Sequence, residues 1–320
     1  RKDITFSGDL MKKRLFVIDG HALCYRAYFA FIKNPLINSR GLNTSAIFGF
    51  ARMLYKLTDE QKPDYLVVAF DPPVKSFRFK MFPEYKANRQ KMPDDLRSQI
   101  DEIRNLTNIL GIRTVMMDEY EADDLLGTIA RKYSSKNCEV VLVTGDKDIL
   151  QCVSPNVRVY ANRKGITEFD LLDRDGVIQR TGIPPEHIID YLALMGDSSD
   201  NIPGVRGVGE KTALGLVQKY GSIDNIYSHL EDIPERQRQL LETGREMAYL
   251  SLDLVTIRTD VDIDLNIEDA ALPDLRTRFA REYFNELEMT SVVRDYFPSE
   301  EEGGKSVQAK TDASARDYRI

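Results

Sequence analysis

The sequence has no tryptophan and only three cysteines, Cys24, Cys138 and Cys152. Because these cysteines have no paired spacing, they exclude a disulfide framework and a zinc knuckle and indicate a reducing compartment. No apolar run approaches the roughly 18–20 residues of a membrane span. The basic stretch that begins at Met11 leads directly into a patterned segment rather than into the apolar part of a signal peptide. We therefore expect a soluble cytoplasmic protein without a membrane partner.

Histidine is equally scarce, and His21, His187 and His229 are scattered along the chain. None of them has a partner at the spacing of a metal site or a catalytic triad, and no Ser-His-Asp or Cys-His arrangement is visible. We expect core or surface roles for these three side chains.

Charged residues, by contrast, are abundant: 51 acidic and 44 basic residues give a formal charge of −7. The net sign alone argues against a polyanionic partner, but the charges are unevenly distributed. Between Lys75 and Arg97 seven basic residues stand against three acidic ones, and elsewhere the acids form tight clusters. Charge segregation of this kind requires a local explanation.

Four short apolar runs lie in the first half of the chain, at residues 15–18, 65–70, 113–116 and 140–144. Continuous apolar runs are typical of parallel strands that are covered on both faces. Helix-period stretches over residues 44–58 and 96–110 lie between them. The alternation of strand and helix predicts an α/β domain with a parallel sheet and right-handed crossovers.

A chain of 320 residues suggests two domains. The strand signals end near residue 183, and helical patterns then continue to about residue 297. We expect a disordered leader over residues 1–10, an α/β domain over 11–182 and a mainly helical domain over 183–297. Residues 298–316 have the composition of a flexible linker, and residues 317–320 resemble the start of a following domain.

The strongest predicted strands all end in an aspartate. Because the carboxyl ends of parallel strands share one edge of a sheet, these aspartates should converge with the acids of two further motifs, residues 121–124 and 196–200. We expect nine carboxylates in one pocket: Asp19, Asp71, Glu121, Asp123, Asp124, Asp146, Asp148, Asp197 and Asp200.

Such a pocket requires bound cations or raised pKa values. Two carboxylates 4 Å apart repel each other by about 1 kcal/mol in water and by about 4 kcal/mol at an effective dielectric constant of 20. Oxygen ligands without histidine or cysteine suit Mg²⁺ or Mn²⁺. Taken singly, each acid is explained better as a helix cap than as a metal ligand. Capping does not explain why every strong strand ends in aspartate, so for the set we favour metal ligation.

The glycine-rich residues 201–213 follow a helix and are not a Walker motif, because Glu210 stands between Gly209 and Lys211. We interpret them as a hairpin between two helices, where glycines allow a nucleic-acid backbone to approach closely. Amides at the start of the second helix would meet its phosphates. An ordinary glycine-rich connection is the alternative, and the Lys-Thr pair at the helix start favours binding.

Residues 76–89 interleave cations with Phe77, Phe79, Phe82 and Tyr85. Aromatic rings can stack on bases while the cations hold phosphates. A solvated helix with an apolar underside would explain an isolated segment of this kind. Its position directly after Asp71, at the mouth of the acidic pocket, favours nucleic-acid binding.

Together these motifs resemble the 5′-nuclease (flap endonuclease) superfamily, specifically the amino-terminal 5′–3′ exonuclease domain of bacterial DNA polymerase I. The resemblance runs from about Met11 to Phe297, and no acidic position of the family is missing. His21 stands where a small polar residue is expected. The matching segments, in order, are residues 17–20, 25–27, 69–71, 77–78, 85–89, 121–124, 144–148, 196–204 and 207–213.

The resemblance implies a PIN-like, parallel-sheet nuclease domain with a helical arch, followed by a mainly helical domain with a helix-hairpin-helix motif. It implies a 5′–3′ exonuclease and 5′-flap endonuclease that removes flaps and RNA primers from branched or nicked duplex DNA in replication and repair, by two-metal hydrolysis. One Mg²⁺ or Mn²⁺ would be served by Asp19, Asp71, Glu121, Asp123 and Asp124. The second would be served by Asp146, Asp148, Asp197 and Asp200.

The resemblance also implies roles for basic and hairpin residues. Lys86 and Arg89 would lie in the arch and steady the scissile phosphate, and Arg26, Arg78 and Tyr85 would be further catalytic residues. A potassium ion at the hairpin and a covalently linked polymerase domain are implied as well, in a monomer; a standalone exonuclease is the variant. The hairpin would hold the duplex backbone through Gly204, Val205, Gly207, Val208, Gly209, Lys211 and Thr212.

Two rival functions fit the residues less well. A catalytically silent nucleic-acid-binding or scaffold protein on the same fold would have lost ligand carboxylates, and none is lost here. A phosphatase of the haloacid dehalogenase type needs an Asp-x-Asp nucleophile after the first strand, whereas Asp19 is followed by Gly20-His21.

Overall fold

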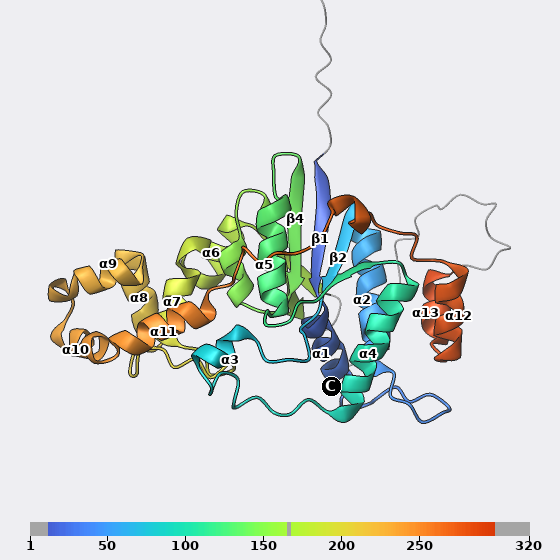
Figure 1. Ribbon diagram of the computed structural model, residues 1–320, viewed down its shortest axis with the longest axis horizontal. Coiled ribbons are helices and arrows are strands. Elements are labelled where there is room, and N and C mark those ends of the chain that lie inside the picture. The colour runs from blue at the N-terminus through green and yellow to red at the C-terminus, as the bar shows by residue number, and fades with distance from the viewer. Residues whose placement is uncertain (1–11, 165–167, 298–320) are drawn as a thin grey trace, which may run out of the picture.

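The structure is a computed structural model that describes residues 12–164 and 168–297 (Figure 1). The expected leader at residues 1–10, the linker at 298–316 and residues 317–320 lie outside the described residues. In the part of the chain that is described, none of the helices has both the length and the apolar character needed to cross a membrane.

Within the described residues, six strands form one sheet in the order β3-β2-β1-β4-β5-β6. Neighbours run parallel except at the edge, where β6 is antiparallel to β5. The strands are β1 (Lys13–Asp19), β2 (Tyr65–Ala69), β3 (Arg113–Val115), β4 (Cys138–Thr144), β5 (Val157–Lys164) and β6 (Glu168–Leu172). The four predicted runs are confirmed as β1 to β4. The predicted parallel sheet is confirmed for these strands, and the antiparallel edge consists of β5 and β6, which were not predicted.

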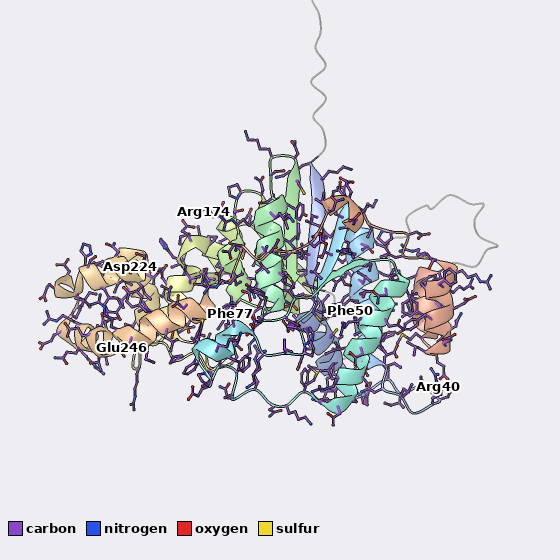
Figure 2. All side chains as sticks on the ribbon, viewed as in Figure 1. Arg40, Phe50, Phe77, Arg174, Asp224 and Glu246 are labelled. Atoms are coloured by element: carbon purple, nitrogen blue, oxygen red, sulfur yellow. The ribbon has the colours of Figure 1, made fainter. Side chains whose placement is uncertain are left out.

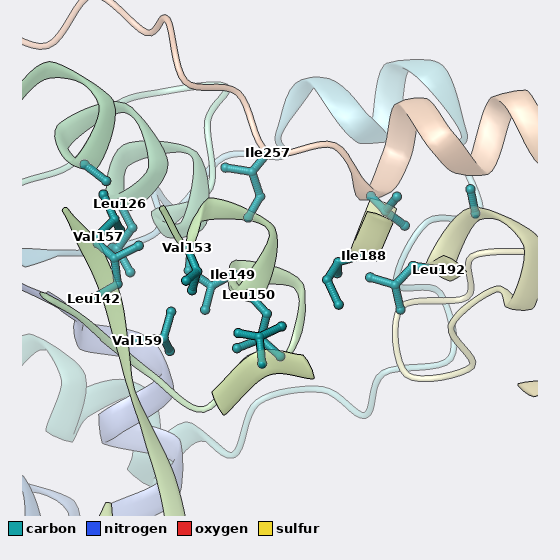
Figure 3. Close-up of a cluster of buried hydrophobic side chains, with 14 of the residues drawn as sticks. Leu126, Leu142, Ile149, Leu150, Val153, Val157, Val159, Ile188, Leu192 and Ile257 are labelled. Atoms are coloured by element: carbon teal, nitrogen blue, oxygen red, sulfur yellow. The ribbon is translucent and has the colours of Figure 1, made fainter. Parts of the chain in front are cut away.

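Alternation along each strand divides the core into two clusters, one on each face of the sheet. Leu15 and Val17 of β1 pack toward α5 (Ala122–Tyr133), whereas Phe16 and Ile18 pack toward α1 (Gly20–Ala30) and the helices beside it. Figure 3 shows the first cluster, which continues from Leu142 and Val157 in the sheet to Ile188 and Leu192 in the helical part. The sheet and the helical part are therefore joined by one continuous core.

The second face is covered by α1 and by the helices of residues 45–61 and 94–109. The helices of the first 182 residues, besides α1 and α5, are α2 (Ser45–Gln61), α3 (Phe77–Met81), α4 (Asp94–Ile109) and α6 (Arg174–Thr181), with the 3₁₀ helix η1 (Asp148–Cys152). The expected helices over residues 44–58 and 96–110 correspond to α2 and α4.

The segment between α3 and α4 is not helical, so the prediction of a helical arch is wrong for residues 82–93. Pro83 disfavours helical backbone at Phe82, which is extended with φ −141° and ψ 99°. Residues 83–88 form turns, and Lys86 has a left-handed φ of 57°. Residues 82–93 therefore form an irregular loop, which we call the basic loop.

The chain beyond residue 183 is mainly helical, as predicted, within the described residues. Its helices are η2 (Pro185–His187), α7 (Ile188–Met195), α8 (Glu210–Tyr220), α9 (Ile223–Ser228), η3 (Leu230–Asp232), α10 (Glu235–Thr243), α11 (Arg245–Val255), η4 (Ile267–Ala270), α12 (Arg278–Glu286) and α13 (Thr290–Tyr296). Helices α8 to α11 lie at one end of the molecule, where Asp224 and Glu246 are labelled, and Phe77 of α3 lies between them and the sheet (Figure 2).

The last described segment returns to the first domain. Residues 256–271 run back along α5 and β2, and α12 and α13 pack against α4 and α2 at the opposite end from α8 to α11 (Figure 1). The rings of Phe284 and Phe297 contact Tyr55 of α2. The predicted helical domain therefore includes a segment that completes the core of the α/β domain, and the boundary at residue 183 stays a prediction.

Candidate functional site

A cavity of about 890 Å³ opens at the carboxyl edge of the sheet, where β1, β2 and β4 end. The strand ends, the start of α5 and the loop after α7 bring acids from distant parts of the chain to this cavity. Six of the nine predicted carboxylates line it: Asp19, Asp71, Glu121, Asp123, Asp146 and Asp197. The side chains of Lys86 and Arg89 from the basic loop line it as well. Lys91 and Lys147 line it too, so the cavity combines clustered acids with four cations.

Two of these aspartates also hold the local backbone. Asp19 Oδ1 accepts a hydrogen bond from the amide of Ala22 at 2.9 Å and so caps α1, while its Oδ2 accepts one from Thr144 Oγ1 at 3.0 Å. Asp71 Oδ1 accepts from the amide of Ala122 at 2.7 Å, at the start of α5. Burial, together with the charge of Asp71, raises the pKa of Asp19 to about 7. Capping and a place in the cavity are therefore compatible roles for one residue.

Asp123 and Asp148 each carry a buried carboxylate oxygen that has no hydrogen-bond partner among the described residues. Burial and the neighbouring Asp146 raise the pKa of both carboxyls well above its ordinary value. A buried, unpaired carboxylate oxygen is costly unless a cation or a proton satisfies it. These two oxygens are the observation that fits a divalent cation at this edge of the sheet.

The donor set also decides which cation fits. The acids supply oxygen alone, which suits Mg²⁺ or Mn²⁺ rather than zinc. Among residues 12–164 and 168–297, no three His, Cys, Asp or Glu side chains are already close enough together to enclose one ion. The residues present therefore fit an Mg²⁺ or Mn²⁺ ion in kind, and ion binding requires small side-chain movements.

Basic side chains pair with the acids at the mouth of the cavity. Lys86 Nζ lies 3.0 Å from Glu121 Oε2 and 3.7 Å from Asp200 Oδ2. Arg89 Nε donates to Asp200 Oδ1 at 2.9 Å, and the amide of Lys86 donates to the Asp200 carbonyl at 2.8 Å. Burial alone would raise the pKa of Glu121, but Lys86 and Arg78 lower it. The basic loop thus contacts both the acidic motif at residues 121–124 and the acidic motif at residues 196–200.

Several predicted site residues lie outside the cavity lining. Asp124 is fully buried and forms a bidentate ion pair with Arg78, at 2.7 and 2.8 Å. Tyr85 is buried, and its hydroxyl donates to Glu121 Oε2 at 3.1 Å and to Asp200 Oδ2 at 3.3 Å. Of the other predicted metal-binding and catalytic residues, Arg26, Asp148 and Asp200 also lie outside the lining.

Sequence reasoning missed several cavity residues. His21 accepts a hydrogen bond at Nδ1 from the amide of Asp71 at 3.0 Å, and burial lowers its pKa. Lys147 pairs with Asp197 at 3.2 Å. One wall is apolar and includes Phe29 and Ile32, which are 53% and 51% exposed. Two sequence signals could have identified them. His21 stands two residues after Asp19, where a small polar residue is expected, and Lys147 lies between Asp146 and Asp148.

The predicted hairpin joins α7 to α8. Gly207 and Gly209 are exposed, as is Lys211 at the start of α8, and no side chain caps that helix. Gly204, Val205 and Val208 are buried, and their amides donate to Ser251 Oγ, the Leu194 carbonyl and the Val205 carbonyl. Only part of the predicted binding set therefore faces solvent, together with the half-buried Thr212.

Two family models match the chain. The model described as 5′–3′ exonuclease, N-terminal resolvase-like domain, matches residues 14–182, and the model described as 5′–3′ exonuclease, C-terminal SAM fold, matches residues 183–278. A 5′–3′ exonuclease of Aquifex aeolicus is 40% identical over 285 residues, which cover 88% of this chain and 95% of that protein.

A DNA polymerase I of Bacillus caldotenax is 41% identical over 263 residues, which cover 82% of this chain. The match spans only 30% of the length of that polymerase. Among solved structures, a bacteriophage T5 flap endonuclease in complex with DNA and metal ions has a TM-score of 0.62 at 22% identity, over 77% of this chain and 90% of that one. Flap endonuclease-1 from Methanococcus jannaschii has a TM-score of 0.56 at 20% identity, over 88% of each chain. At these identities the structural likeness establishes the fold.

Proposed function

The chain belongs to the 5′–3′ exonuclease family, and on this basis we propose that it is a divalent-metal-dependent nuclease that cuts 5′ flaps and 5′ ends of branched or nicked duplex DNA. The observation that carries the proposal is the convergence of six carboxylates and four basic side chains on one cavity. A phosphodiester is an anion, and a cavity lined by acids alone would repel it. Metal ions beside the acids and the cations of the basic loop would make the cavity attractive to it.

The residues that would hold one ion are Asp19, Asp71, Glu121 and Asp123, and those for a second are Asp146, Asp148, Asp197 and Asp200. Two Mg²⁺ or Mn²⁺ ions bound there would activate a water and stabilise both the attacking and the leaving oxygen of an in-line displacement. Asp123 and Asp148 are the first candidates for ligands, because each presents an oxygen without a partner among the described residues. We leave Asp124 out of this set, since Arg78 already neutralises it.

The basic loop would orient the scissile phosphate. Lys86 and Arg89 lie at the cavity between the two acidic groups, so that a phosphate entering there would meet both cations. Arg89 is half exposed and can turn toward a ligand, whereas Lys86 is largely buried. Their charge would offset the negative charge that develops as the bond breaks.

The hairpin would hold the duplex away from the cavity. Exposed glycines and the uncapped start of α8 suit a phosphate backbone, which carries no sequence information. A potassium ion at this hairpin belongs to the same proposal. In this arrangement the hairpin selects duplex, and the cavity selects a 5′ end or flap beside it.

The biological setting is proposed from the relatives and from composition. Removal of RNA primers and flaps in replication and repair fits a chain that resembles part of DNA polymerase I, and a covalently linked polymerase domain is the expected partner. We further propose a monomer with a cytoplasmic location, in keeping with the cysteine usage.

The direct test is incubation with a labelled 5′-flap duplex, with and without Mg²⁺. We expect cleavage near the junction that requires Mg²⁺ and is restored by Mn²⁺ after chelation. A flapless single strand of the same sequence should be a poor substrate. Metal-independent cleavage, or equal cleavage of the single strand, would contradict the proposal.

A further inference from the structure

The C-terminal end of α11 is held by two side chains, Gln151 and Arg78, that come from distant parts of the chain. Gln151, in the 3₁₀ helix that begins with Asp148, donates to the Val255 carbonyl at 2.9 Å and accepts from the Ile257 amide at 3.0 Å. Arg78, at the base of the basic loop, donates to the carbonyls of residues 254 and 256 at 2.8 and 3.0 Å. We call residues 254–258 the α11 seat.

The partner of Arg78 is Asp124, and each of its carboxylate oxygens receives two hydrogen bonds. Oδ1 accepts from Arg78 at 2.8 Å and from the amide of Arg258 at 2.9 Å. Oδ2 accepts from Arg78 at 2.7 Å and from the amide of Glu121 at 3.0 Å. A carboxylate has about four acceptor sites, so all of them are occupied here. Asp124 therefore has no lone pair left to offer to a metal ion.

The other end of this connection is the hairpin. The amide of Gly204 donates to Ser251 Oγ of α11 at 3.0 Å, one turn before the α11 seat. The backbone there is tightly packed, because a methyl group added to Gly204 would lie 2.4 Å from the Gly196 nitrogen. A shift of the hairpin is thus passed to α11 rather than absorbed locally.

We propose that Arg78 and Asp124 form a positioning pair that couples duplex binding at the hairpin to the geometry of the acidic cavity, and that neither residue contacts substrate or metal. The pair reaches the cavity through the amide of Glu121 and through α3, which leads into the basic loop. The side chains of Arg78 and Asp124 are 4% and 0% exposed, so the hydrogen bonds between them are shielded from water. The proposal rests on the nuclease function proposed above.

Metal binding without DNA tests the first half of the proposal. Asp124→Asn should keep the wild-type number of bound Mn²⁺ ions, counted from the signal of free Mn²⁺ by electron paramagnetic resonance, whereas Asp123→Asn should lose at least one ion. If Asp124→Asn unfolds, the double variant Arg78→Met/Asp124→Leu replaces it, since an apolar pair of similar volume can substitute for a buried ion pair. Loss of an ion from a folded variant of Asp124 would overturn the proposal.

Hydrogen exchange tests the coupling. On binding a flapless duplex in Ca²⁺, the wild-type chain should gain protection both at residues 204–212 and at residues 77–93. In the double variant the gain in protection at residues 204–212 should remain, and the gain at residues 77–93 should vanish. Single-turnover flap cleavage should fall by about tenfold or more, which is within the usual range of coupling between sites. The matched control is Arg14→Met/Glu139→Leu. This ion pair joins the starting ends of β1 and β4, away from the acidic cavity, with 3.3 Å between Arg14 Nε and Glu139 Oε2. The control should keep both gains in protection.

The outcomes separate this proposal from the one on which it rests. Protection of both segments in the double variant would overturn the coupling while leaving the nuclease function intact. No protection at residues 204–212 in the wild-type chain would overturn duplex binding at the hairpin, and the coupling with it.

Discussion

Asp123 is half-buried, lines the acidic cavity and combines a buried, unpaired carboxylate oxygen with a raised pKa. Asp123→Asn should lower flap cleavage by on the order of 100-fold or more, the scale associated with loss of a transition-state contact. Because the substitution removes a buried charge, the melting temperature should stay equal or rise. Flap binding in Ca²⁺ should persist. The control is Asp262→Asn at an exposed position, which should cut normally; wild-type cleavage by Asp123→Asn would contradict the metal assignment.

Lys86 provides the second residue-scale prediction. Its ammonium group lies between Glu121 and Asp200, where it can meet the charge that develops on a phosphate. Lys86→Ala should lower single-turnover cleavage at saturating enzyme by roughly 100-fold, or about 3 kcal/mol, and change the flap dissociation constant only a few-fold. Lys80→Ala, on α3 outside the cavity, is the matched control. Normal single-turnover chemistry with binding lost would make Lys86 a phosphate anchor only.

At the scale of elements, the sequence predicted those strands and helices that are recognisable from a short run of neighbouring residues. Strands β1 to β4 were predictable, with an aspartate at the end of three of them (β1, β2 and β4), because short continuous apolar runs are typical of strands buried on both faces. Strands β5 and β6 were missed, since an edge hairpin mixes charged and apolar residues, as in Arg158 and Asp170. The arch was expected to be helical, although Pro83 already restricts the backbone of the preceding residue. The Arg78–Asp124 pair was beyond reach, because composition does not show which acid will meet a buried arginine.

The hairpin is the element with the simplest steric test. A side chain at Gly209 would meet no atom within 4 Å, and its φ is −94°, so a substitution is tolerated sterically. Gly209→Val should therefore weaken duplex binding through blocked approach of the backbone, at a stability cost of about 1 kcal/mol for the altered helix start. Affinity is measured by titration of duplexes of different sequence at several salt concentrations.

The matched control is Gly215→Ala in the middle of α8, where added atoms also meet open space. The Gly215→Ala variant should leave duplex affinity unchanged and stabilise the helix by roughly 0.5–1 kcal/mol.

The wild-type chain should bind duplexes of all sequences equally, and its affinity should fall as the salt concentration rises. A strong sequence preference would be incompatible with a backbone-binding hairpin.

At the scale of the whole molecule, α12 and α13 complete a core that begins with α2. Phe284 of α12 is fully buried against Tyr55, whereas Phe279 of the same helix is 73% exposed. Phe284→Ala should lower the free energy of unfolding by about 3–5 kcal/mol, as expected for loss of a buried ring. Phe279→Ala should change it by less than about 0.5 kcal/mol. Urea unfolding followed by circular dichroism measures both; equal effects would mean that α12 does not contribute to the core.

The return of residues 256–297 to the sheet has a consequence for synthesis on the ribosome. Helix α2 is made early, and α1, the sheet and α4 cover most of its apolar side, but the aromatic residues that pack on Tyr55 are made more than two hundred residues later. At about 5–20 residues per second, this face stays uncovered for roughly 10–50 s. We therefore expect the surface around Tyr55 to be exposed in the nascent chain until α12 and α13 have left the exit tunnel, so that slow translation between residues 61 and 278 lengthens this exposure.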